Sequence, residues 1–326
     1  MTYTIGNVLD VLPTLAAGRF RCCVTSPPYW GLRDYGHPDQ LGLEPTPEAY
    51  VARMVEVFRE VRRTLTDDGT LWLNVGDSYA GARGGAQGAG GQMADRSVAK
   101  SRCREVGITR VADGCKPKDL VGIPWMLAFA LRADGWFLRQ DIIWHKPNPM
   151  PESVRDRCTK AHEYVFLLSK SERYFWDAEA MKEPAVGANL HDVTGRTKQR
   201  GLADTFKRKD SKRAQAIPGQ SVGTHREDRP DSTYDLYTRN RRSVWTVATR
   251  PYKGAHFATF PPALIEPCIL AGAPFDGLVL DPFTGSGTTA AVALQHGRRF
   301  IGCELNPDYI KLAEARIAAA EAEVLW

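Results

Sequence analysis

The stretch Asp281-Pro282-Phe283-Thr284-Gly285-Ser286-Gly287-Thr288-Thr289-Ala290 decides the fold of this chain. An apolar run at residues 277–281 leads into it, and a helical pattern at residues 286–296 follows it. Glycines in a turn between a strand and a helix let a ligand approach the backbone N–H groups at the start of the helix. Glu304, nineteen residues after Gly285, is an acid of the kind that binds ribose hydroxyls. The turn therefore predicts an α/β sheet with a site for a cofactor that contains a nucleoside.

The glycine pattern itself leaves more than one cofactor open. A phosphate-binding P-loop is excluded, because no lysine follows the second glycine. A dinucleotide fingerprint is a fair match in Gly285-x-Gly287-x-x-Ala290, so a nicotinamide-dependent oxidoreductase is a competing interpretation. Only 36 residues follow Ala290, which is room for one more strand and helix, whereas a dinucleotide-binding domain continues through several such units.

Strand and helix patterns alternate on both sides of the middle of the chain. A helix is predicted to begin at Thr46 with a capping side chain and a proline, and to end at Asp67-Asp68-Gly69. The other predicted helices cover residues 124–131, 286–296 and 306–324, and the predicted strands cover residues 20–25, 70–75, 138–144, 164–168, 277–281 and 299–303. This alternation predicts one α/β sheet interrupted by an insertion.

Composition excludes several classes of protein. The 326 residues are 43% hydrophobic and 25% charged, which is enough to bury one large core or two smaller lobes. The longest apolar window is far shorter than the roughly 20 residues of a membrane helix, and no secretory signal is visible, so we expect a cytoplasmic protein. The seven cysteines are scattered without paired spacings, so we expect free thiols and no metal site.

Two segments interrupt this globular pattern. Residues 81–100 begin with a glycine-rich run and are predicted to form a mobile loop. Residues 186–250 hold 14 Lys and Arg against 7 Asp and Glu, although the whole chain has a net charge of only +5. This basic segment favours contact with nucleic acid. The candidates for phosphate or base contacts are Lys207, Arg208, Lys209, Lys212, Arg213, Arg239, Arg241 and Arg242.

A second turn, Thr25-Ser26-Pro27-Pro28-Tyr29-Trp30, directly follows the first predicted strand. Two prolines remove two N–H donors, so the carbonyls of Ser26 and Pro27 are free to accept hydrogen bonds, for example from the exocyclic amine of a nucleobase. Tyr29 and Trp30 offer flat faces on which a base could stack.

Together the two turns resemble those of the amino-group DNA methyltransferases. Ser26-Pro27-Pro28-Tyr29 matches that family's catalytic motif (Asp/Asn/Ser)-Pro-Pro-(Tyr/Phe), and residues 281–287 match its cofactor motif. Residues 122–125, 143–148, 162–164 and 256–261 look like further blocks of the family. The catalytic motif comes first and the cofactor motif last, which is the order of the family's β group, a circular permutation of the usual methyltransferase sheet.

The resemblance implies a circularly permuted, Rossmann-like α/β fold that uses S-adenosylmethionine and carries an inserted target-recognition region. Residues 1–185 would form the catalytic part, residues 186–250 the recognition region, and residues 251–326 the cofactor-binding part. Double-stranded DNA would be the substrate. The resemblance also admits a cognate restriction endonuclease as a partner, and a homodimer.

The resemblance also assigns cofactor contacts. Glu304 would bind the ribose, the N–H groups of residues 285–288 would surround the methionine part, Asp281 would lie near its ammonium, and Phe283 would face the sulfonium or the adenine. The full set of cofactor candidates is Asp281, Phe283, Thr284, Gly285, Ser286, Gly287, Thr288, Glu304, Phe260 and Asn7.

For catalysis, Ser26 and the Pro27 carbonyl would accept the hydrogens of the target amine while Tyr29 stacks on a base flipped out of the helix. Methylation at carbon 5 of cytosine is disfavoured, because the single Pro-Cys dipeptide, Pro267-Cys268, lies in an apolar stretch with a helical pattern. Serine at position 26 favours N4 of cytosine, since aspartate there is the commoner adenine form. Adenine N6, an RNA substrate and a catalytically silent DNA-binding module remain open alternatives.

Overall fold

The computed structural model describes residues 2–81, 104–105, 115–185, 238–249 and 260–324. The chain divides into two compact units, residues 1–181 with 242–326, and residues 182–241. Lys207, Arg208, Lys209, Lys212 and Arg213 lie outside the described residues, as does nearly all of the glycine-rich run that begins at Gly81.

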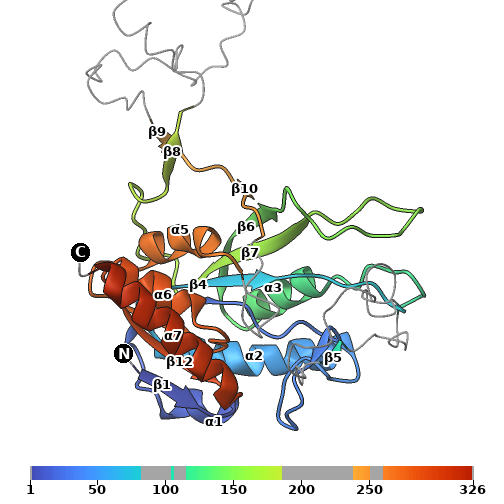
Figure 1. The fold of residues 1–326 in the computed structure, drawn as a ribbon, viewed down its shortest axis with the longest axis horizontal. Helices are drawn as coiled ribbons and strands as arrows, with labels where there is room; N and C mark the ends of the chain where they lie inside the picture. Colours follow the sequence, from blue (N-terminus) through green and yellow to red (C-terminus); the bar gives the residue numbers. More distant parts are fainter. Residues whose placement is uncertain (1, 82–103, 106–114, 186–237, 250–259, 325–326) are drawn as a thin grey trace, which may run out of the picture. The chain divides into compact units, whose positions relative to one another are not determined.

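The first unit is built on an eight-stranded sheet with the order β1-β12-β11-β2-β4-β7-β6-β10 (Figure 1). Only β7 runs antiparallel to its two neighbours, β4 and β6, while the other neighbouring strands are parallel. The carboxyl ends of seven strands and the amino end of β7 therefore share one edge. The strands are β1 (Thr2–Ile5), β2 (Phe20–Thr25), β4 (Leu65–Val75), β6 (Phe137–His145), β7 (His162–Ser169), β10 (Val244–Thr246), β11 (Leu278–Asp281) and β12 (Arg299–Glu304).

Helices cover both faces of this sheet, because successive strand residues point to opposite sides. Leu71 and Leu73 of β4 pack in a core with α1, α2 and α3, whereas Trp72 between them packs in a second core with α5, α6 and α7. The helices are α1 (Val8–Val11), the 3-10 turn η1 (Leu12–Thr14), α2 (Pro47–Thr64), α3 (Ile123–Ala133), α5 (Pro262–Gly272), α6 (Thr288–Gln295) and α7 (Pro307–Val324). Among the helices that the structure describes, none has the length and apolarity needed to cross a membrane.

Helix α2 begins as predicted but ends earlier. The Thr46 hydroxyl accepts a hydrogen bond from the Ala49 amide at 3.1 Å, and Pro47 occupies the first helical position. The predicted end at Asp67-Asp68-Gly69 is wrong, because Leu65 already begins β4 and pairs with Phe20 of β2. The register then shifts, and pairing resumes between Cys22 and Thr70, so the acidic turn signal lies inside an irregular strand rather than at a helix end.

Two further sheets are small. β3 (Arg33–Asp34) pairs with β5 (Arg104–Glu105) in the first unit. In the second unit, β8 (Lys182–Pro184) pairs with β9 (Thr238–Asn240), and Arg239 of β9 forms a 2.9 Å ion pair with Glu183 of β8. Residues 244–246, which the sequence placed in the basic region, form β10 of the main sheet.

Candidate active site

Both sequence turns lie at the sheet edge where the parallel strands end, and they line one cavity of about 920 Å³. The catalytic turn follows β2, and the glycine turn follows β11, which is the neighbour of β2 in the sheet. Ligands of open α/β sheets bind at this kind of edge. The cavity lining includes, from the expected residues, Asn7, Ser26, Pro27, Pro28, Tyr29, Phe260, Asp281, Phe283, Thr284, Gly285, Ser286, Thr288 and Glu304.

The Asp281 carboxylate ties the two turns together. It accepts hydrogen bonds from the Thr25 hydroxyl at 2.6 Å, from the Thr289 hydroxyl at 2.7 Å and from the Phe283 amide at 3.0 Å. Burial raises the pKa of Asp281 to about 6, against the lowering effect of these hydrogen bonds. The carboxylate is thus held by β2 and α6 within the chain, and its expected contact with a cofactor ammonium stays a prediction.

The glycine turn has the left-handed backbone that its sequence requires. Gly285 has φ +52° and Gly287 has φ +77°. A Cβ atom on Gly287 would lie 2.8 Å from the Ala313 Cβ of α7, so the absence of a side chain allows α6 and α7 to pack.

The amides of this turn are less available than expected. The Gly285 amide donates to the Glu304 carboxylate at 2.7 Å, and the Gly287 amide donates to the Thr284 carbonyl at 2.9 Å. Two of the four amides expected around the cofactor, those of Gly285 and Gly287, thus have partners within the chain. The contact of residues 285–288 with the methionine part of the cofactor stays a prediction.

Glu304 ends β12 with its carboxylate in the cavity wall. Its oxygens accept from the amides of Gly285 at 2.7 Å and Asn306 at 2.8 Å, and burial raises its pKa to about 7. Nearby, the Ser286 hydroxyl is buried and has no hydrogen-bond partner among the described residues. An acidic group and an unpaired hydroxyl on one wall fit a ligand that carries hydroxyl and other polar groups, as the nucleoside part of S-adenosylmethionine does.

Asn7 and Phe260 complete this part of the lining. The Asn7 side-chain oxygen caps α1 by accepting from the Leu9 amide at 2.9 Å, and the adjacent Gly6 amide donates to the Glu304 carbonyl at 3.0 Å. Half-buried Phe260 precedes α5. Their assignment as cofactor contacts stays a prediction.

The catalytic turn is rigidly held. The Tyr50 hydroxyl of α2 donates to the Pro28 carbonyl at 2.9 Å. Trp30 is only 5% exposed, packs in the core, and donates from its indole nitrogen to the Glu44 carbonyl at 2.8 Å. The expectation that Trp30 offers a face for base stacking is therefore wrong, because the core needs its apolar ring. Base stacking on Tyr29 stays a prediction.

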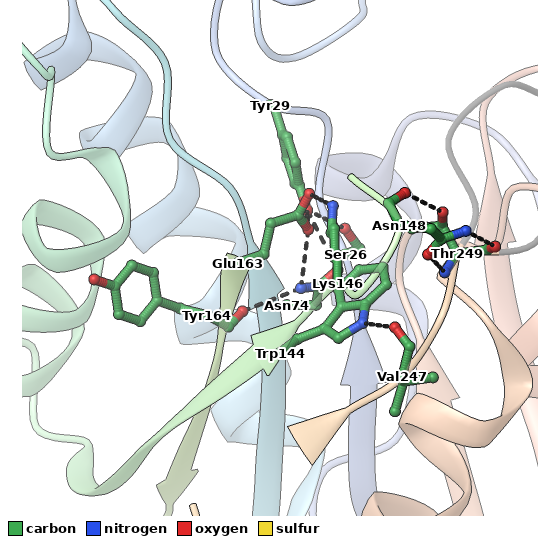
Figure 2. A network of polar contacts seen from close by, with 10 residues as sticks. All are labelled: Ser26, Tyr29, Asn74, Trp144, Lys146, Asn148, Glu163, Tyr164, Val247 and Thr249. Carbon is green, nitrogen blue, oxygen red and sulfur yellow. Dashed lines mark hydrogen bonds and ion pairs between the residues drawn. The ribbon is translucent and has the colours of Figure 1, made fainter. Parts of the chain in front are cut away.

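A polar network fixes Tyr29, and Figure 2 shows its members. The Tyr29 hydroxyl donates to the Glu163 carboxylate at 2.8 Å, lies 3.3 Å from the Asn74 side-chain oxygen, and accepts a long 3.5 Å hydrogen bond from Ser26. Burial, and then the Glu163 charge, raise the pKa of Tyr29 well above its ordinary value, so the phenol is neutral. Glu163 in turn forms an ion pair with Lys146, and the two side chains are 17% and 18% exposed.

Asn74, Lys146 and Glu163 are site residues that were not expected from the sequence. Lys146 and Glu163 lie in blocks that matched the family, and Asn74 is near the end of a predicted strand. Polar residues at strand ends were a usable signal for Asn74 and Lys146. Glu163 is the second residue of β7, so placing it at the same edge required knowing that β7 runs antiparallel.

The basic candidates that the structure describes already have partners within the chain. Arg239 is paired with Glu183, and Arg241 and Arg242 also have interactions within the chain. The Arg242 carbonyl accepts from the Trp245 indole at 2.8 Å. The role of Arg239, Arg241 and Arg242 in binding DNA stays a prediction.

Comparison with known proteins identifies the family. The model of the N6/N4 methyltransferase family, described as DNA methylase, matches residues 20–315. The chain is 44% identical over 320 residues to the type II methyltransferase M.XycI of Xanthomonas campestris pv. cyanopsidis, covering 98% of this chain and 88% of the relative. It is 43% identical to M.Cfr9I of Citrobacter freundii with the same coverage, and 44% identical to M.SmaI of Serratia marcescens, covering 96% and 89%.

Solved structures share the fold. The PvuII DNA methyltransferase, described as cytosine-N4-specific, matches with a TM-score of 0.60 and 17% identity, covering 99% of this chain and 92% of that one. TTHA0409 of Thermus thermophilus, solved in complex with S-adenosylmethionine, matches with a TM-score of 0.56 and 23% identity, covering 98% and 93%. The nicotinamide-dependent alternative is wrong, because the chain matches DNA methylases along nearly its whole length. The chain belongs to the N6/N4 DNA methylase family and is an S-adenosylmethionine-dependent DNA methyltransferase.

Proposed function

We propose that this enzyme methylates the N4 amine of a cytosine that is flipped out of double-stranded DNA. The observation that carries the proposal is that the Ser26-Pro27-Pro28-Tyr29 turn and the glycine turn line the same cavity. Its volume of about 920 Å³ lies at the upper end of the range for ligand sites, so it has room for a cofactor and an extruded base together.

The catalytic turn supplies what an exocyclic amine needs. Such an amine is a poor nucleophile, because its lone pair is conjugated with the ring. Acceptors for its two hydrogens, the Ser26 hydroxyl and the Pro27 carbonyl, would favour a pyramidal nitrogen with a more available lone pair. Bound S-adenosylmethionine supplies an electrophilic methyl group on its sulfonium. Holding the target amine against the methyl group of the cofactor would accelerate methyl transfer through positioning and electrostatics.

Tyr29 would hold the flipped base by stacking, which is worth about 1–3 kcal/mol per base. Its raised pKa keeps the phenol uncharged beside the base. The cost of extruding the base, a few kcal/mol, is partly offset by this contact.

The four buried cysteines among the described residues, Cys22, Cys23, Cys268 and Cys303, disfavour methylation at carbon 5, which requires a thiolate nucleophile. Burial raises the pKa values of Cys22 and Cys303 to about 12. Cys268 of the Pro-Cys dipeptide is buried within α5, and its thiol points to the Leu264 carbonyl.

Two observations favour cytosine over adenine. Serine stands at position 26, where aspartate would be the commoner adenine form. In addition, a methyltransferase of the same fold, that of PvuII, is described as cytosine-N4-specific. The alternative is N6 methylation of adenine by the same residues.

We also propose that residues 186–250 recognise the DNA target, and that Arg239, Arg241 and Arg242 contact it. Residues 1–185 would then form the catalytic part of the enzyme, and residues 251–326 the cofactor-binding part. The relatives are type II methyltransferases, which favours a cognate restriction endonuclease as a functional partner and the cytoplasm as the compartment.

The test is incubation with methyl-labelled S-adenosylmethionine and unmethylated genomic DNA, followed by digestion to nucleosides and mass spectrometry. We expect N4-methylcytosine. N6-methyladenine would overturn the choice of base, and cofactor binding without any methylated nucleoside would favour a silent DNA-binding module.

A further inference from the structure

We propose that Glu163 is a positioning residue that acts through Tyr29 to make the Ser26 hydroxyl a hydrogen-bond acceptor for the target amine. The inference rests on the proposed role of Ser26 and Tyr29 in catalysis. It concerns three side chains that meet at one edge of the sheet, from the turn after β2 and from the start of β7 (Figure 2).

The direction of the hydrogen bonds follows from the chemistry of the groups. The Tyr29 hydroxyl has two acceptors within reach, and its single hydrogen goes to the nearer one, the Glu163 carboxylate at 2.8 Å, rather than to the Asn74 side-chain oxygen at 3.3 Å. The Tyr29 oxygen is then left to accept from Ser26, at 3.5 Å. Because the Ser26 hydrogen points to Tyr29, the lone pairs of Ser26 are directed away from it and can accept from an amine in the cavity.

Glu163 is itself placed for this task. One carboxylate oxygen faces the Lys146 ammonium, while the other accepts from Tyr29 and, at 3.4 Å, from the Asn74 amide. Asn74 also donates to the Tyr164 carbonyl at 3.1 Å, which anchors it to β7. One carboxylate oxygen therefore has Lys146 as its partner, and the other has Tyr29 and Asn74.

Lys146 is positioned in turn by its neighbours. Its ammonium lies 4.3 Å from the centre of the Trp144 ring, and the Trp144 indole donates to the Val247 carbonyl at 2.8 Å. These contacts run from the segment after β10, through β6, to the catalytic turn. They place the Glu163 carboxylate beside Tyr29. Among the hydrogen bonds and ion pairs of the described residues, none joins Glu163 to the glycine turn.

The Tyr29 ring is also confined sterically. A Cβ atom on Gly76 would lie only 2.6 Å from the Tyr29 Cε2 atom and 3.4 Å from the Glu163 carboxylate carbon. The ring is thus packed against backbone on one side while its hydroxyl is held by Glu163. This confinement and the shorter contact with Glu163 both favour a hydroxyl hydrogen directed at Glu163 rather than at Asn74.

The experiment is a double-mutant cycle on methyl transfer, with kcat and KM for DNA and the Kd for S-adenosylmethionine measured for Glu163→Gln, Tyr29→Phe and the double variant. Glutamine can donate as well as accept, so the fixed direction is lost. We expect Glu163→Gln to lower kcat about tenfold or more with cofactor affinity unchanged. In the Tyr29→Phe background, where the hydroxyl is gone, the same change should alter kcat by less than about twofold.

The outcomes separate this inference from the proposed function. If Glu163→Gln lowers kcat by the same factor in both backgrounds, or leaves it unchanged in the wild type, the inference is overturned. If Tyr29→Phe and Ser26→Ala leave methyl transfer intact, the assigned catalytic turn fails instead.

Two further variants guard against a simple folding defect. Glu163→Asp keeps the charge but withdraws the carboxylate from Tyr29, so kcat should fall while the thermal midpoint stays near that of the wild type. Glu56→Gln is the matched control, because Glu56 pairs with Arg53 on the exposed side of α2 and should leave kcat unchanged.

Discussion

The Thr25 hydroxyl donates a 2.6 Å hydrogen bond to the Asp281 carboxylate, joining residues that are 256 positions apart in the sequence. Thr25 ends the strand before the catalytic turn, and Asp281 ends the strand before the glycine turn. The two motifs of this methyltransferase are thus linked directly, at the last residue of each strand before its loop begins. Thr289, in the first turn of α6, donates to the same carboxylate.

Replacing Thr25 by valine should destabilise the protein, because it leaves a buried carboxylate with one hydrogen bond fewer. We expect the free energy of unfolding to fall by about 1–3 kcal/mol at about pH 8, measured by urea denaturation. The pKa of Asp281 should rise further above about 6, since the Thr25 bond lowers it.

Thr66→Val is the matched control for this change. The Thr66 hydroxyl oxygen is buried and has no hydrogen-bond partner among the described residues, so its removal should be neutral or slightly stabilising. If Thr25→Val and Thr66→Val lower the free energy of unfolding equally, the hydrogen bond from Thr25 to Asp281 does not stabilise the protein.

Cofactor affinity should depend on pH through Glu304. Burial raises the pKa of its carboxyl to about 7, so the acceptor form that we expect to bind the ribose is lost as the pH falls through 7. Between about pH 8 and pH 6 the ionised fraction drops about tenfold, and the Kd for S-adenosylmethionine should rise by a similar factor.

Glu304→Gln should bind the cofactor more weakly at pH 8 and lose this pH dependence. Without cofactor, the raised pKa of Glu304 makes the wild type lose stability as the pH rises from about 4.5, the ordinary value of this carboxyl, to about 7. Glu304→Gln should lack this loss, which calorimetry at pH 5 and pH 8 would measure. A pH profile of cofactor binding identical in both proteins would rule out Glu304 as the titrating group.

Gly287→Ala should damage both stability and cofactor binding. Its φ of +77° disfavours a side chain, and the new Cβ would collide with Ala313 of α7 at 2.8 Å. We expect a loss of more than about 2 kcal/mol in unfolding free energy, combining backbone strain with overpacking. Gly18→Ala provides the comparison, because φ there is +64° but nothing lies within 4 Å of the added atom. If Gly287→Ala and Gly18→Ala lower the free energy of unfolding equally and both proteins keep their cofactor affinity, close packing of α6 against α7 is not needed for the conformation of the glycine turn.

Gly76→Ala should impair methyl transfer without impairing cofactor binding. The added methyl group would occupy space that the Tyr29 ring fills, so the ring must shift. We expect kcat to fall about tenfold or more, since small displacements at a reacting centre are costly. Isothermal calorimetry with S-adenosylmethionine should give a Kd near that of the wild type. An unchanged kcat would mean that the position of the Tyr29 ring does not limit the reaction.

Several helices and strands were predicted correctly from the sequence, because the residues that specify them are close together in the chain. The strand at residues 20–25 has the predicted bounds, and the helix predicted at 306–324 is found at Pro307–Val324, with the Asn306 side chain accepting from the Asp308 amide at 2.9 Å. Apolar runs, caps and glycine turns specify such elements without reference to the rest of the chain.

What the sequence did not predict depends on tertiary context. The edge strands β1 and β10 have only four and three residues, and they exist because β12 and β6 offer partners. Leu65 fits the apolar face of α2 equally well, and only its pairing with Phe20 assigns it to β4. Trp30 and Tyr29 are neighbours in a motif, yet one is drawn into the core and the other toward Glu163.

The most direct test of the account is single-turnover methyl transfer by Ser26→Ala, with S-adenosylmethionine binding measured by calorimetry on the same preparation. If Ser26 accepts a hydrogen of the target amine, the variant should bind the cofactor as tightly as the wild type. Its rate of transfer to DNA should be at least about 10²-fold lower, the typical effect of removing one preorganised polar contact. Transfer at the wild-type rate would contradict the claim that the catalytic turn and the glycine turn form one active site.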